Sequence, residues 1–484
     1  MTDEIICLSD TSSEDDDPIN KVREFDLSVD YFSRHVKCPK LALDDHFRAY
    51  IKKENLERRF KPLKCSSELI EKVVSNYLIV KQILSNLHWR DKLLCKHVCT
   101  TWYAAVQSLR REQLAPVDYS MVFPMSSVIW AKLTMSSELV NEPLVVMTFV
   151  NKDGVQSTRH CPSIHPPPCS VPCDEIHCLL DSIHKYTSAP KQCANVIQSE
   201  YFSYLPVPTS VTYKLSKTMM ERSRPHLLGL FIPVIPDVKL HTIIINKEWN
   251  MRKFYKVVKH ISRNRIFKGI LVYVSDKNFL RSVGLGPFLN YFQELQPDIP
   301  FGYGGCLIQN TLFKHNGIKR TVQRVAEGKV YRSGNKVSIS VFTIPKNPQS
   351  NECNFNMYSL VVDVGENELE AQETINEFSK RVPQFEYSAV IKLSSEPENW
   401  FEKKPIWEQD YFRAAFPNTT LIGCFGKGQL GVDHPPKPDP SPYPPKKKPC
   451  PAPRPLEQNY NRVYSDSTVF VYMGWGKILS NGPP

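Results

Sequence analysis

Cysteine and histidine gather between residues 160 and 178, in a stretch that is also rich in proline. Zinc sites in proteins take four thiolate or imidazole ligands, usually in pairs two to four residues apart. Cys169 and Cys173 have this spacing, but Cys173 and Cys178 lie further apart, and prolines interrupt the run after Cys161. We therefore predict no metal and no cofactor, and keep these four cysteines only as a candidate zinc set. The alternative is a proline-rich surface insertion with incidental thiols.

Glycines at positions 426, 428 and 431 form the pattern Gly-x-Gly-x-x-Gly. In a dinucleotide-binding fold this pattern follows a strand and opens a helix. The strand-like run TTLIGCF precedes it, but the following GVDHPPKPDP is too rich in proline to form a helix. The sequence therefore predicts a glycine hairpin turn. Because no Gly-x-Ser-x-Gly or His-Glu-x-x-His motif occurs either, nothing in the sequence supports an enzyme.

The bulk composition predicts a globular intracellular chain. A hydrophobic fraction of 41% in 484 residues allows buried cores in about two to four domains. No apolar run is long enough for a membrane span, and the acidic start MTDEIICLSD is unlike a signal peptide. The 14 cysteines are scattered through apolar segments, as is usual for reduced thiols. We expect the protein in the cytoplasm and the nucleus.

The charge is uneven along the chain. The formal net charge is +11, yet residues 1–17 hold seven acids and no Lys or Arg. The basic residues are spread over the remainder instead of clustering on one predicted helix. This distribution favours a soluble basic surface over a nucleic-acid site.

The N-terminal 20 residues are predicted to be a disordered acidic tail, followed by a linker over 21–65. Within the tail, the apolar run containing Ile5, Ile6 and Leu8 precedes serines, a threonine and acids. A short apolar strand of this kind can add to an exposed sheet edge, and it resembles a SUMO-interacting motif. SUMO binding and a solvated tail without a partner both remain open for these residues.

The most specific pattern lies in residues 66–112, which are predicted to be helical. Val80, Ile83, Leu84 and Leu87 have the spacing of one apolar helix face. After a break, Asp91 is expected to cap a second helix. That helix is expected to present Cys95, Val98, Cys99 and Trp102 on its apolar face.

These positions resemble an F-box, although the Leu-Pro pair usual at the start of that motif is not evident beside Tyr77-Leu78. The resemblance implies docking onto a Skp adaptor, which joins F-box proteins to a cullin scaffold. An ordinary helical hairpin is the alternative. The residues that the resemblance assigns to the adaptor are Ile83, Leu84, Leu87, Leu93, Leu94, Val98, Cys99 and Trp102.

The larger C-terminal region alternates strand-like and helix-like segments. GILVYVS and PFGYGGC flank a helical stretch and predict a strand–helix–strand unit. Gly304 and Gly305 predict a sharp turn or a close approach to a neighbouring chain segment. Segments such as HLLGLFIPVI and FRAAFPNTTLIGCFGKGQLGVD resemble the FIST module, a sensory domain found beside some F-boxes.

The expected fold class is α+β, with a small helical F-box followed by a two-part FIST-like region of mostly antiparallel sheets. The two parts are expected at 117–250 and 251–480. A proline-rich insertion at 434–455, which includes Lys446–Lys448, is expected to be a stiff loop within the second part. An extended docking segment or a nuclear signal is the other interpretation of that insertion.

Together these features predict a non-catalytic subunit of a Skp–cullin–F-box ubiquitin ligase. Its F-box would hold the Skp adaptor, and its FIST-like region would hold unidentified target proteins for ubiquitination and degradation. The alternative function is a small-ligand sensor in which the helical segment is merely structural. Neither hypothesis requires a membrane or nucleic acid.

Overall fold

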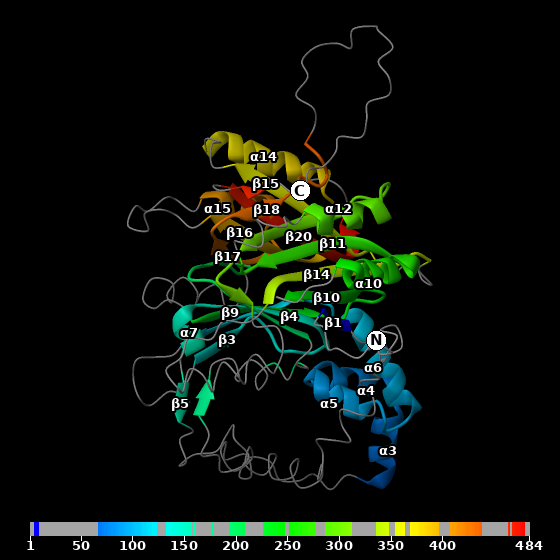
Figure 1. The fold of residues 1–484 in the computed structure, drawn as a ribbon. Helices are drawn as coiled ribbons and strands as arrows, with labels where there is room; N and C mark the ends of the chain where they lie inside the picture. Colours follow the sequence, from blue (N-terminus) through cyan, green and yellow to red (C-terminus); the bar gives the residue numbers. More distant parts are fainter. Residues whose placement is uncertain are drawn as a thin grey trace. The chain divides into compact units, whose positions relative to one another are not determined.

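In the computed structural model, the described residues form two compact units (Figure 1). Residues 66–109 belong to the first unit, and the remaining described residues belong to the second. The structure describes residues 4–8, 66–122, 132–156, 158–160, 176–178, 187, 189, 193–208, 226–246, 251–276, 286–311, 335–347, 354–363, 368–395, 407–437, 463–464 and 467–479.

The smaller unit consists of short helices. They are α3 (Ser67–Ser75), α4 (Tyr77–Ser85), α5 (Trp89–Cys95) and α6 (Thr100–Glu112). The division between the two units falls inside α6, between Leu109 and Arg110. The expectation of helices over residues 66–112 is therefore confirmed.

The larger unit is built from three main sheets. In spatial order, the seven-stranded sheet contains β1 (Glu4–Leu8), β10 (Lys239–Asn246), β14 (Asn335–Pro345), β11 (Arg265–Val274), β12 (Gly302–Leu307), β18 (Gln429–Gly431) and β19 (Val463–Tyr464). The six-stranded sheet contains β13 (Asn310–Thr311), β7 (Ala194–Gln198), β4 (Pro143–Val150), β9 (Leu227–Pro233), β2 (Val117–Val122) and β3 (Lys132–Met135). The five-stranded sheet contains β15 (Asn356–Asp363), β20 (Ser467–Leu479), β16 (Gln384–Ser395), β17 (Thr420–Gly426) and β8 (Phe202–Leu205).

Helices and one small strand pair complete this unit. The strands β5 (Thr158–His160) and β6 (Ile176–Cys178) pair only with each other. The helices are α7 (Lys152–Gln156), α10 (Met251–Asn264), α12 (Gly286–Leu295), α14 (Glu368–Arg381) and α15 (Trp407–Ala415).

The three main sheets repeat one topology. In each, four strands from one stretch of chain stand in the spatial order first, fourth, second, third. The second and third strands are parallel, and the fourth is antiparallel to both of its neighbours. The described strands therefore form three topological repeats, over residues 117–233, 239–345 and 356–479.

Each repeat receives one closing strand from another repeat. β13 follows β12 along the chain and pairs with β7, whereas β18 follows β17 and pairs with β12. β8 follows β7 and pairs with β17, which completes the cycle. Because unpaired backbone groups at a sheet edge are costly when buried, the donated strands bind the three repeats into one body.

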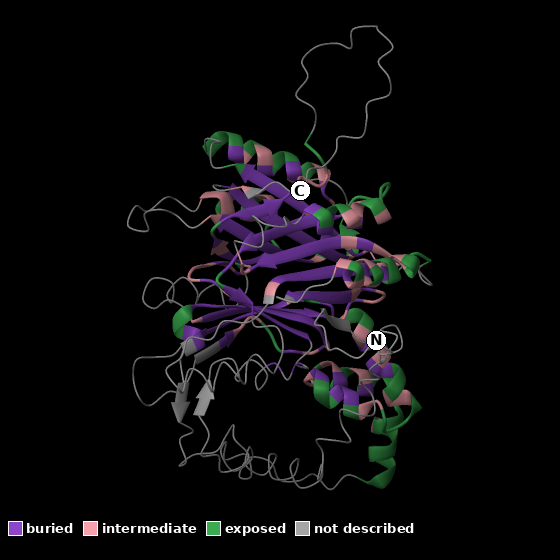
Figure 2. Cartoon of the chain, in the orientation of Figure 1, coloured by how far each residue is buried: buried purple, intermediate pink, exposed green. Residues whose placement is uncertain are grey.

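The three sheets also share one apolar interior. Met147 of the six-stranded sheet, Tyr273 of the seven-stranded sheet and Ile391 of the five-stranded sheet all belong to it. Along β11 the side chains alternate, so that Tyr273 faces this interior and Val272 faces the helices α10 and α12. Figure 2 shows the resulting burial pattern, in which the strands of the main sheets are buried through most of their length and the helices are partly exposed.

Several sequence-based expectations are confirmed. The class is α+β with mostly antiparallel pairing. The predicted strand–helix–strand unit is β11–α12–β12, whose two strands are parallel neighbours.

The division expected at 250/251 differs from the structure, because it falls between β10 and α10, inside one topological repeat and one compact unit. The linker at 21–65 and residues 438–455 of the proline-rich insertion lie outside the described residues.

The glycine hairpin predicted at 426–431 is not formed. A turn at Lys427-Gly428 does separate two strands, but β17 lies in the five-stranded sheet and β18 in the seven-stranded sheet. The local sequence predicts a turn correctly, whereas the pairing partners come from distant segments. The strand β18 covers the last three residues of the glycine pattern, where a dinucleotide site would need the beginning of a helix.

Gly304 and Gly305 lie within β12, where they permit close approach instead of a sharp turn. A Cβ atom on Gly304 would stand 2.3 Å from Cγ2 of Val471. A Cβ atom on Gly305 would stand 2.2 Å from the backbone carbonyl oxygen of Val272, on the paired strand β11. The atom that a Cβ on Gly304 would meet is the end of a side chain, which can move. The atom that a Cβ on Gly305 would meet is a backbone oxygen of the paired strand, which can move only if the sheet is distorted.

We therefore predict that Gly305→Ala destabilises the larger unit more than Gly304→Ala does. Repacking around Val471 is expected to cost about 1–3 kcal/mol, and displacement of the β11 backbone more than about 3 kcal/mol. Urea unfolding followed by tryptophan fluorescence measures both, with the partly exposed Ser379→Ala as the control. Equal costs at the two glycines would contradict the packing described for β12.

Candidate functional site

The helical unit begins α4 at a well-formed N-cap. The Asn76 side-chain oxygen accepts hydrogen bonds from the backbone N–H groups of Leu78 at 3.0 Å and Ile79 at 3.2 Å. Capping satisfies donors that have no partner inside the helix, and it fixes where the helix starts. As a result, Leu78 and Ile79 stand in the first turn of α4, at the place where the F-box resemblance begins.

The interior of the helical unit is small. Its buried cluster is completed by half-buried Leu87, Cys95 and Trp102, and its fully buried members are Val80, Leu84, Ala105, Val106 and Leu109. Trp102 also donates a hydrogen bond from Nε1 to the carbonyl oxygen of Val74 at 2.9 Å, which ties α6 to the end of α3. A core of this size contributes little stability by itself.

One buried cation lies within the same helices. Lys92 is 4% exposed, and its Nζ atom donates to the carbonyl oxygen of Ser85 at 3.4 Å, near the end of α4. Burial lowers the pKa of Lys92 to about 8. The contact joins α5 to α4 and gives the buried ammonium group of Lys92 a hydrogen-bond acceptor.

The outer surface of the helical unit is unusually apolar. Ten of the fourteen large hydrophobic side chains exposed in the described part of the chain lie between residues 69 and 103. Leu78 is 74% exposed and Val98 is 62% exposed. The ten are Leu69, Ile70, Val74, Tyr77, Leu78, Ile79, Ile83, Leu94, Val98 and Tyr103. Exposed apolar residues concentrated in so short a segment are typical of a protein-binding surface.

The predicted adaptor-binding residues divide into three groups. Ile83, Leu94, Val98 and Cys99 are exposed and therefore available to a partner. Leu87 and Trp102 are half-buried and pack against the small core. Leu84 and Leu93 are buried, so in this conformation they support the fold and do not offer a contact surface.

Two local expectations require correction. The N-cap of α5 is His88, whose Nδ1 accepts from the backbone N–H of Arg90 at 3.3 Å, so Asp91 lies inside the first turn and does not cap. The run from Cys95 to Trp102 is not one helix face. α5 ends at Cys95 and α6 begins at Thr100, and a short turn carries Val98 and Cys99. A helical spacing can continue by chance across so short a break.

Sequence reasoning missed the exposed apolar residues of α3 and of the first turn of α4. None of the residues of α3 is buried, although Leu69, Ile70 and Val74 are apolar. An amphipathic helix whose apolar side faces solvent looks the same in sequence as one that faces a core. Only the burial pattern separates these residues from Val80 and Leu84.

Glu4–Leu8 form the strand β1, so the expectation that the N-terminal 20 residues are disordered is wrong for these five residues, whereas the interpretation of this run as a short apolar strand is confirmed. Its partner is β10 of the same chain, in parallel register from Glu4 opposite His241 to Leu8 opposite Ile245. The side chains of Ile5, Ile6 and Leu8 lie outside the described atoms, and residues 9–20 lie outside the described residues. A strand has two hydrogen-bonding edges, and β10 occupies one edge of β1.

The candidate zinc ligands can be placed only in part. Cys161, Cys169 and Cys173 lie outside the described residues, and Cys178 is described only as a backbone position in β6. Within the part of the chain that the structure covers, no group of three or more His, Cys, Asp and Glu side chains is placed to hold a metal. A search of the same residues finds no helix long and apolar enough to cross a membrane.

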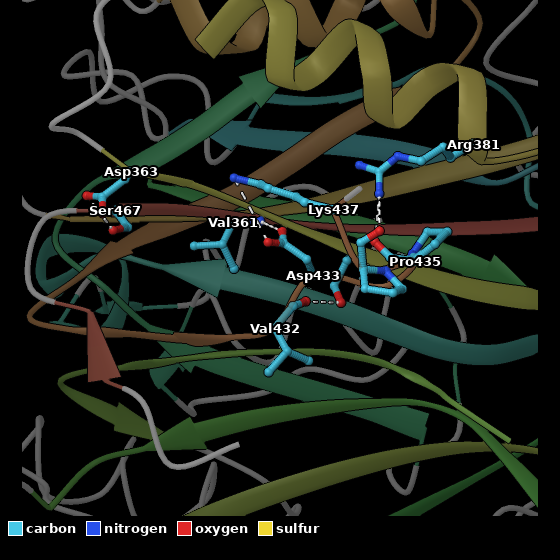
Figure 3. A network of polar contacts seen from close by, with 10 residues as sticks. Val361, Asp363, Arg381, Val432, Asp433, Pro435, Lys437 and Ser467 are labelled. Atoms are coloured by element: carbon cyan, nitrogen blue, oxygen red, sulfur yellow. Dashed lines mark hydrogen bonds and ion pairs between the residues drawn. The ribbon is translucent and has the colours of Figure 1, made fainter. Parts of the chain in front are cut away.

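A polar network holds the start of the proline-rich segment (Figure 3). Asp433 accepts a hydrogen bond from the backbone N–H of Val361 at 2.8 Å, and its carboxylate lies 3.9 Å from Nζ of Lys437. Arg381 of α14 donates to the carbonyl oxygen of Pro435 at 3.1 Å. Burial raises the pKa of Asp433. These contacts attach the segment to β15 and α14.

His434 lies in the same network. Its backbone pairs with Ser359 through hydrogen bonds of 2.8 and 3.0 Å, and its ring stacks on Tyr358 at 5.5 Å between centroids. Burial, reinforced by the charge of Lys268, lowers the pKa of His434 to about 4. The buried Nδ1 atom has no hydrogen-bond partner among the described residues. The network is therefore an anchor for the chain.

A hollow of about 430 Å³ lies between α10 and α12. Its volume suits a small ligand, but Pro287, Asn290 and Glu294 of its lining are exposed, and Tyr255 and Tyr291 are half-exposed. Ligand sites usually combine enclosure with a few buried polar groups. The hollow does not favour the ligand-sensor hypothesis.

In comparisons with known proteins, no family model and no curated protein matches this chain. The F-box and FIST resemblances therefore rest on the residues quoted above.

We predict that His434 makes the larger unit sensitive to acid. The unfolded chain protonates this histidine near pH 6.5 and the folded chain only near pH 4, so stability falls as the pH decreases between these values. His434→Phe retains a ring against Tyr358 and removes the titrating group. The melting temperature of the variant should therefore fall less between pH 7 and pH 4.5.

The control for this experiment is His97→Phe, because His97 is an exposed residue of the helical unit. It should leave the pH dependence of the larger unit unchanged. Identical pH profiles for His434→Phe and the unaltered protein would show that His434 titrates normally.

Proposed function

We propose that this chain is the substrate-recognising subunit of a Skp–cullin–F-box ubiquitin ligase, without catalytic activity of its own. The observation that carries the proposal is the exposed apolar surface of α3 to α6, where ten large hydrophobic side chains lie over a core of five fully buried residues. A unit that exposes more large apolar groups than it buries gains stability by binding a partner.

The F-box resemblance names the class of partner. Exposed Ile83, Leu94 and Val98 coincide with positions that the resemblance assigns to the Skp adaptor. Buried Leu84 and half-buried Trp102 hold the helices in place behind them. In this proposal the adaptor covers the exposed residues and joins the chain to the cullin. The buried and half-buried residues contribute only by holding the helices in position.

The larger unit is the proposed binder of target proteins. Its three sheets form one body with a shared interior, which gives a rigid base for a recognition surface. The ligase would accelerate ubiquitin transfer by proximity, because the target lysine is held beside the charged conjugating enzyme of the same assembly. We propose that the protein acts in the cytoplasm and the nucleus. SUMO is a further proposed partner, bound by Ile5, Ile6 and Leu8.

Co-elution with the Skp adaptor tests the proposal. We predict that the full chain and the adaptor leave a sizing column together, and that Leu94→Asp combined with Val98→Asp abolishes the complex. Both residues are exposed, so the charges are tolerated in the free chain and become costly only when a partner buries them. Affinity should fall at least about a hundredfold, as for residues at the centre of an interface.

Leu369→Asp on α14 is the matched control, since Leu369 is 69% exposed and belongs to the larger unit. It should retain the complex. Melting curves must show that all variants fold. Failure of the folded wild-type chain to bind the adaptor would overturn the proposal, and so would equal loss of binding in Leu369→Asp.

A further inference from the structure

The outer face of α10 is strongly basic. Arg252, Lys256, Lys259 and Arg263 are exposed and recur at intervals of four, three and four residues, which places them along one face of the helix. The buried residues of α10, which include Phe254 and Val258, lie on the opposite face. The helix contains no Asp or Glu. At about 1.5 Å per residue, the basic face extends for roughly 16 Å.

Three of the four basic side chains on this face have charges that no described residue pairs with. The side chains of Lys256, Lys259 and Arg263 form no ion pair or hydrogen bond among the residues that the structure describes. Nearby positive charge adds to the potential: burial, together with the charges of Arg265, Lys239 and His260, lowers the pKa of His241 to about 3. The region around β10 and α10 therefore attracts anions.

The acidic residues follow β1 directly in the chain. Because β1 and β10 are parallel, Leu8 lies opposite Ile245, near the end of β10 at Asn246, and α10 is the next described element, beginning at Met251 (Figure 1). The nine residues that follow Leu8, SDTSSEDDD, contain five acids and no base. Extended at about 3.3 Å per residue, they reach roughly 30 Å and exceed the length of the basic face.

We propose that the outer face of α10 is a docking surface for an acidic peptide segment, and that its resident occupant is residues 10–17 of this chain. β1 fixes one end of the segment to β10, so binding is intramolecular and needs only modest affinity. Phosphate groups on Ser12 or Ser13 would add charge and strengthen the contact. A partner with a longer or more charged acidic segment would displace the tail. This inference is independent of the proposed ligase function.

A carbodiimide, which joins carboxylates to neighbouring lysine amines, tests the proposal on the full chain at low salt. We expect linked peptides between residues 10–17 and Lys256 or Lys259, and we expect their yield to fall at least tenfold in 0.5 M NaCl, since salt screens exposed charges. A variant with Glu14→Gln, Asp15→Asn, Asp16→Asn and Asp17→Asn should lose the links by the same factor.

The matched control removes three exposed lysines elsewhere on the same unit, by Lys346→Gln, Lys380→Gln and Lys477→Gln. It should retain the links, which separates docking on α10 from general attraction to a basic protein. Links distributed equally over other lysines would overturn the proposal. It would equally be overturned if a single-stranded oligonucleotide bound the full chain with the same affinity with and without the four acids and lost that affinity when Lys256 and Lys259 were replaced by Gln, because nucleic acid would then be the occupant of this face.

Discussion

The larger unit depends on strand exchange between its three topological repeats. Each repeat leaves the third strand of its sheet without an outer neighbour, and a short strand from another repeat fills that place. β13 has two residues and β18 has three, so their own packing is slight. Their importance is that they satisfy backbone groups at buried edges. Since the donation is cyclic and the three sheets share one interior, loss of one donated strand weakens two repeats.

The helical unit differs from the larger unit in how its apolar side chains are distributed. Its buried core is small, it exposes more large apolar side chains than it buries, and one of its buried groups is the lysine Lys92. The described strands of the larger unit bury their apolar side chains in shared cores, whereas the helical unit exposes an apolar surface typical of protein interfaces. This contrast is consistent with the proposed division of labour, in which the helices bind the adaptor and the larger unit binds the target.

The sequence alone predicts those elements whose signals are local. The run before Gly426 forms a strand, the segment between GILVYVS and PFGYGGC forms a helix, and the apolar N-terminal run forms a strand. It does not predict pairing between residues more than a hundred positions apart, such as Gln429 with Cys306, because such pairing has no local pattern. For the same reason it does not distinguish exposed Ile83 from buried Leu84, which occupy neighbouring positions on one apolar helix surface.

Hydrogen–deuterium exchange of the full chain, with and without the Skp adaptor, tests the proposed docking of the adaptor on the helical unit. We expect the adaptor to slow exchange in α4, α5 and the start of α6, in the region of Ile83, Leu94 and Val98. We expect no change in the strands of the three main sheets. Slower exchange confined to the sheets, or no change in any segment at adaptor concentrations that saturate known F-box proteins, would contradict this docking.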